Sequence, residues 1–182
     1  MYATDAISPD GKRIAVVRHT SKGEYLEIGP AGGHGPWQRI YRSSYYLTTD
    51  LYWARPNLIA FGDSNIETNT IDVRTHRVHF RLATATSFNV SNDGRWIAWS
   101  WAGAPDAPAT VGVVPITGGA CLVPPRPANR EDTLAFFKPG VKRLYFLRGP
   151  WSVRGHVEGA TRIISVPWSS LRRDSVRVCQ RG

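Results

Sequence analysis

The stretch ISPDGKRIAVV (residues 7–17) decides the fold, because NVSNDGRWIAWSW (residues 89–101) repeats its pattern. Each begins with a short apolar stretch, continues through a turn ending in Asp-Gly and a basic residue, and closes with an apolar strand. Gly11 supplies the positive φ that a tight hairpin needs. The pattern predicts a β-hairpin at both places, with Asp10 and Asp93 as turn formers rather than ligands or catalysts.

Two weaker copies of the pattern occur, LYWARPNLIAF (residues 51–61) and LAFFKPGVKRLYFL (residues 134–147). The four copies align on one apolar residue each, with spacings of 45, 38 and 47 residues: Ile14, Ile59, Ile97 and Leu144. A period of this length with short strands is typical of propeller blades rather than helical repeats.

Each copy continues with two further strands, which bring the expected number to four antiparallel strands per copy. The turn between these strands is glycine-rich in two copies, as PAGG (residues 30–33) and TGG (residues 117–119). The sequence therefore predicts an all-β chain, a single β-propeller-like domain over residues 1–182. Its approximate blades are residues 3–43, 47–83, 86–126 and 132–180.

The segment SPDGKRIAVV followed by PAGG resembles the WD-like (PD40) repeat of TolB-type proteins, which also builds the propellers of prolyl-oligopeptidase-like peptidases. The resemblance implies a β-propeller scaffold that mediates protein–protein interaction without being an enzyme. Relatives with this repeat are often periplasmic or exported, although no signal peptide is visible in this chain and its compartment stays open.

The number of blades predicts an incomplete or open ring, because TolB-like propellers usually have about six, within a general range of four to eight. Two blade faces would then lack a neighbour, one with Ile14 and Val16 and the other with Leu144 and Phe146. Such faces predict self-association or a protein partner, or a fragment of a longer protein. A compact four-bladed ring is the alternative.

Catalytic and metal-binding patterns are absent from the sequence. No G-x-S-x-G elbow, phosphate-binding glycine loop or cysteine cluster occurs. His76 and His79 would point to opposite faces of a strand. The sequence predicts no enzyme activity, no cofactor and no metal, and its longest uncharged stretch, residues 107–125, is too rich in proline and glycine for a membrane helix.

Two expected loops are longer than hairpins need, residues 102–109 and 148–159, and binding residues collect on such loops. The candidate contact residues for a ligand or partner are therefore Trp101, Trp151, Arg154 and His156. Trp99, on the same strand face as Trp101, is expected in the core.

Two alternatives to the scaffold stay open: an accessory propeller segment of a prolyl-oligopeptidase-like peptidase lacking its catalytic domain, and an arginine-rich binder of anionic polymers such as nucleic acid. The second is based on residues 138–182, which hold ten Lys and Arg against two acidic residues. Cys121 and Cys179 are expected to be free thiols, because outer strands of neighbouring blades diverge.

Overall fold

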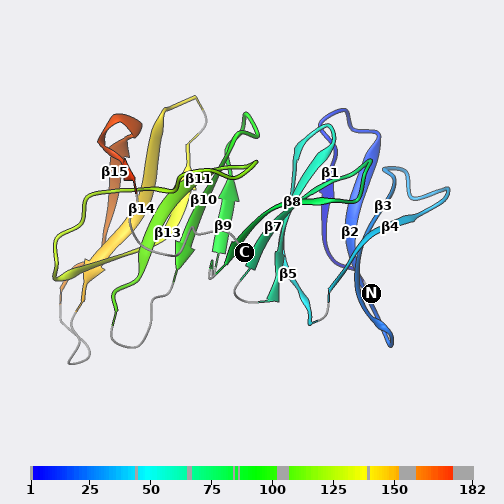
Figure 1. Cartoon of the computed structure of the whole chain (residues 1–182), viewed down its shortest axis with the longest axis horizontal. Helices are drawn as coiled ribbons and strands as arrows, with labels where there is room; N and C mark the ends of the chain where they lie inside the picture. The colour runs from blue at the N-terminus through cyan, green and yellow to red at the C-terminus, as the bar shows by residue number, and fades with distance from the viewer. Residues whose placement is uncertain are drawn as a thin grey trace. The chain divides into compact units, whose positions relative to one another are not determined.

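The computed structural model describes residues 2–43, 45–64, 67–83, 85, 87–101, 107–138, 140–151 and 159–173. These residues form four antiparallel β-sheets and no α-helix, as Figure 1 shows. None of them lies in a helix that is long and apolar enough to cross a bilayer. The chain divides into two compact units, residues 1–83 and residues 84–181, which are described separately.

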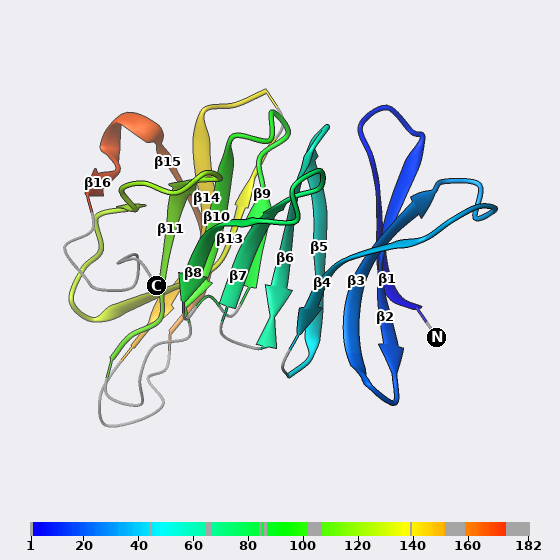
Figure 2. The ribbon, with the colours of Figure 1, turned by 45° about the vertical axis from the view of Figure 1, so that its right-hand side comes forward.

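The first unit contains two four-stranded sheets, each ordered as in the sequence. The strands of the first sheet lie side by side in Figure 2: β1 (Tyr2–Ile7), β2 (Arg13–Thr20), β3 (Gly23–Pro30) and β4 (Gln38–Ser43). Those of the second are β5 (Leu47–Arg55), β6 (Leu58–Asp63), β7 (Glu67–Asp72) and β8 (Val78–Ala83). Both sheets have the predicted make-up of a blade.

The second unit contains a five-stranded and a three-stranded sheet. The five-stranded sheet has the order β16-β12-β11-β10-β9: β9 (Ser87–Val90), β10 (Trp96–Trp101), β11 (Thr110–Pro115), β12 (Leu122–Val123) and β16 (Arg172–Arg173). The other comprises β13 (Arg130–Phe137), β14 (Arg143–Pro150) and β15 (Arg162–Pro167). Residues 175–180, predicted as the last strand of the fourth copy, lie outside the described residues.

The Asp-Gly turns are formed as predicted, with φ of 70° at Gly11 and 63° at Gly94. Asp10 Oδ1 accepts the Ser8 hydroxyl at 2.6 Å and the Lys12 N–H at 3.1 Å. These bonds, that of Ser8 above all, hold the pKa of Asp10 below its ordinary value. Asp93 accepts the same pair of bonds in the third copy, so both aspartates are turn formers.

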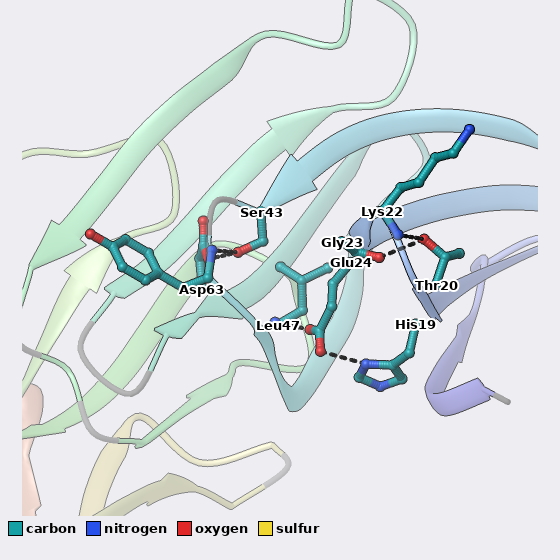
Figure 3. Close-up of polar contacts among 9 residues, drawn as sticks. His19, Thr20, Lys22, Gly23, Glu24, Ser43, Leu47 and Asp63 are labelled. Atoms are coloured by element: carbon teal, nitrogen blue, oxygen red, sulfur yellow. Dashed lines mark hydrogen bonds and ion pairs between the residues drawn. The ribbon is translucent and has the colours of Figure 1, made fainter.

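The core of the first unit lies between its two sheets, where Leu26 and Ile28 pack with Ile59 and Phe61. Polar side chains also connect these sheets. Figure 3 shows the buried Asp63 of β6 accepting the Ser43 hydroxyl of β4. In the same view Glu24 of β3 accepts the Leu47 N–H of β5 and contacts His19.

The core of the second unit corrects the predicted exposed faces. Leu144 and Phe146 are fully buried and pack against Val111 and Val113 of the neighbouring sheet. The expectation that they form a face without a neighbour is wrong, because alternate residues of a strand point to opposite faces. Val16 is likewise buried, at 3% exposure.

Candidate binding surfaces of the second unit

Two of the four predicted contact residues are described by the structure, and both are half-buried at strand ends. Trp101 is the last residue of β10 and pairs with Thr110. Trp151 directly follows β14, and its N–H donates to the Asn129 carbonyl at 3.0 Å. Arg154 and His156 lie outside the described residues. Trp99 is fully buried, which confirms its predicted place in the core.

Trp151 lines a hollow of about 510 Å³ together with Arg130, Arg148 and Arg162. Arg148 belongs to the scaffold, because its guanidinium donates to the buried Asp132 carboxylate at 2.7 and 2.9 Å. Arg130 and Arg162 supply the remaining positive charge of the hollow. The sequence pointed to Trp151 but not to these arginines, which begin β13 and β15 and come together only through strand pairing.

A second hollow, here called the aromatic cleft, has a volume of about 550 Å³. It is lined by the Asp-Gly turn of the third copy and by four residues of the fourth, Lys138, Gly140, Val141 and Lys142. Three rings line it. The Trp96 and Trp168 rings meet edge to face, with centroids 4.5 Å apart at 89°, and the Phe137 ring lies 6.1 Å from that of Trp168.

The charged residues around the aromatic cleft are mostly basic: Arg95, Lys138 and Lys142 against Asp93. Arg95 and Asp93 are 3.9 Å apart and largely exposed, so their attraction is weak. The Trp168 indole nitrogen is buried and has no hydrogen-bond partner. The sequence did not indicate this cleft, because its two turns are over forty residues apart in the chain.

The third surface, here called the outer face, is the side of the β13-β14-β15 sheet opposite Leu144 and Phe146. Phe136 and Ile163 lie on this side and are 38% and 68% exposed, and Leu134, which is 57% exposed, lies at the adjoining register shift of β13. The Phe136 ring stacks on that of Tyr145 at 5.6 Å.

Leu134 has an unusual backbone conformation, with a φ of 52°, at a register shift between β13 and β14. A β-branched or bulky residue rarely adopts this left-handed region. Such strain commonly marks a functional position.

Comparison with solved structures identifies the architecture. The structure of putative TolB from Agrobacterium tumefaciens matches with a TM-score of 0.59 and 15% identity. The chain folds as TolB-like β-propeller blades. The crystal structure of the tricorn protease also matches, with a TM-score of 0.57 and 20% identity over 76% of this chain. No family model matches the sequence, and no curated protein does.

The chain spans less than two thirds of either solved structure: its match covers 63% of the TolB chain and 14% of the tricorn chain, with 93% of this chain aligned to TolB. In a propeller each blade packs face to face with its neighbours. The outer face is therefore the surface of the fourth blade to which a further blade would pack.

The described residues contain no cluster of three or more His, Cys, Asp or Glu side chains that could hold a metal ion. Cys121 is disulfide-bonded, so the prediction of a free thiol is wrong for this residue. Cys179, the other cysteine of the sequence, lies outside the described residues.

Proposed function

We propose that this chain is a non-enzymatic propeller scaffold that binds protein through the outer face, and that the first partner is a second copy of the chain. The observation that carries the proposal is the exposure of Phe136 and Ile163 on one side of the fourth blade, with the exposed Leu134 at the register shift next to them. Packing these side chains against a second apolar face removes them from water, which favours association.

The first blade is a poor match for this apolar face. The side of its sheet that faces away from the unit's core carries Glu27, whose carboxylate lies 3.0 Å from Arg18 and 2.8 Å from Arg39. Glu27 is already buried, but Arg18 and Arg39 are partly exposed, and burying their charges against apolar side chains is costly. The outer face therefore fits best against its own copy, which produces an isologous dimer with two-fold symmetry.

Light scattering coupled to size exclusion tests the proposal. We expect a mass near twice 20.2 kDa at high protein concentration, falling toward 20.2 kDa on dilution. Ile163→Asp should shift the protein to the monomer, whereas Ile7→Asp, an exposed isoleucine on the first sheet, should not. A monomer at every concentration, or equal effects of the two variants, would contradict the proposal.

The variant Leu134→Gly tests whether Leu134 contributes to dimerisation independently of its effect on the stability of the fold. Glycine adopts positive φ freely, so relief of a strain of about 1–2 kcal/mol offsets the extra chain entropy of about 0.4–1 kcal/mol. We expect an unchanged or slightly raised melting temperature together with weaker dimerisation. Unchanged dimerisation would remove Leu134 from the interface.

The two remaining functions predict different results. If the chain is an accessory propeller of a peptidase, ester or peptide substrates should be hydrolysed once its catalytic partner is present. If the chain is a scaffold, the purified chain should hydrolyse none of them. Turnover abolished by a serine-directed reagent would overturn the non-enzymatic proposal. A binder of anionic polymers predicts DNA or RNA binding that falls steeply as salt rises.

A further inference from the structure

We propose that the aromatic cleft binds a short acidic peptide segment that carries an aromatic side chain. The cleft is lined by residues from the third and fourth blades within the second unit. The sequence showed that Lys138 and Lys142 belong to a basic segment, but it did not show the cleft. It is a separate site from the outer face, so its test is independent of dimerisation.

The rings of the cleft set the shape of the ligand. The Trp96 and Trp168 rings stand at 89° to each other, and Phe137 lies beside them. This corner accepts a third ring edge to face, the arrangement that aromatic pairs favour. A volume of about 550 Å³ suits one or two side chains rather than a folded domain.

The charged residues of the cleft favour a ligand with negative charge. Lys138 and Lys142 are exposed on the same turn, and no acidic side chain in the described part of the chain forms an ion pair with either. Arg95 adds a third positive charge, against Asp93 alone. A carboxylate next to the bound ring would therefore be attracted to the two lysines.

The indole of Trp168 adds a hydrogen-bonding argument. Its N–H group is buried without an acceptor, a state that is costly in a folded protein. A ligand carboxylate or peptide carbonyl that reached this nitrogen would supply the missing acceptor. Nucleic acid fits less well, since the perpendicular rings offer no parallel platform for stacked bases.

The experiment is a calorimetric titration of the full chain with a capped hexapeptide in which glutamate alternates with phenylalanine. The matched ligand replaces each glutamate with glutamine. We expect binding of the glutamate peptide that weakens in high salt, accompanied by a change in tryptophan fluorescence. Equal binding of the glutamine peptide, or no binding of either, would overturn the proposal.

Two charge variants locate the site. The double variant Lys138→Gln with Lys142→Gln should bind the glutamate peptide about tenfold more weakly, as expected for two partly exposed ion pairs. The control, Lys12→Gln with Lys22→Gln, removes the same charge from exposed lysines of the first unit. Equal weakening by the control would show diffuse attraction and overturn the site.

A third variant and a competitor complete the test. Trp168→Leu should reduce affinity and the fluorescence change together, while the melting temperature reports whether the blade still folds. If Trp168→Leu loses the melting transition of the blade, the lysine variants, which keep the rings, decide whether the peptide binds in the cleft. Displacement of the peptide by a short oligothymidine that binds more tightly would assign the cleft to nucleic acid instead.

Discussion

Replacing Gly112 with alanine tests how the third blade is packed. Gly112 lies in β11 directly opposite Trp99 of β10, and Trp99 is fully buried. A Cβ atom at position 112 would lie 2.5 Å from Cζ2 of Trp99 and 2.8 Å from the carbonyl oxygen of Leu122. The indole could shift, but a backbone oxygen within the sheet cannot move without disturbing the β11-β12 pairing.

The expected cost follows from these two contacts. Overpacking a core by one carbon typically destabilises a protein by about 1–3 kcal/mol. Two contacts far below van der Waals separation place Gly112→Ala toward the upper end of that range. For a chain of this size each kcal/mol lowers the melting temperature by about 2–4 °C, so circular dichroism should record a drop of roughly 5–10 °C.

Two further variants show whether the clash is the cause. Gly32 has open space around its Cβ position, and Gly32→Ala should leave the melting temperature within about 1–2 °C of the parent. Adding Trp99→Leu to Gly112→Ala removes the clashing ring, so the double variant should lose less stability than the two single losses combined. If Gly112→Ala and Gly32→Ala have the same melting temperature, the clash with Trp99 and Leu122 does not destabilise the protein and the packing explanation is refuted.

Three other predictions follow from buried or bonded groups. Asp132→Ala leaves the Arg148 cation without its buried counter-charge and should cost about 3–5 kcal/mol in urea unfolding. Arg74→Met removes a largely exposed arginine that lies 3.9 Å from Asp72 and should cost no more than about 1 kcal/mol. Burial, and then the bond to Asp63, raises the pKa of Tyr41, so the free energy of unfolding should fall as pH rises above about 10, and Tyr41→Phe should reduce that fall. Peptide mapping without reductant should join Cys121 to Cys179, the one other cysteine of the sequence, and an alkylated Cys121 would contradict the bond.

Local turn chemistry made the fold predictable from sequence. Asp-Gly preceded by serine in residues 8–11 and 91–94 has one physical outcome, a tight turn bonded to its own backbone, and the structure contains both turns. Three of the four apolar anchors, Ile59, Ile97 and Leu144, are fully buried, and Ile14 is half-buried. The period therefore located the strands even where the turn motif was degraded.

The features that the sequence did not reveal depend on long-range pairing. β16 adds to the edge of the third blade through β12, where Leu122 pairs with Arg173, and no local signal encodes that partner. The sequence also did not show which side of the fourth blade is buried, because Leu144 and Phe146 are covered only when they pack against Val111 and Val113 of the neighbouring sheet. The aromatic cleft was missed for a related reason, since Trp168 meets Trp96 only after the two blades pack.

The repeat motif that reveals the fold is an unsuitable place to look for the function. Asp93 Oδ1 already accepts the Ser91 hydroxyl at 2.6 Å and the Arg95 N–H at 3.1 Å, so these polar atoms are occupied in holding the turn. Asp10 is occupied in the same way in the first blade. Residues outside the turn are therefore better candidates for binding. Lys138 and Trp168 meet that condition, because neither belongs to the Asp-Gly turn and both line the same cleft.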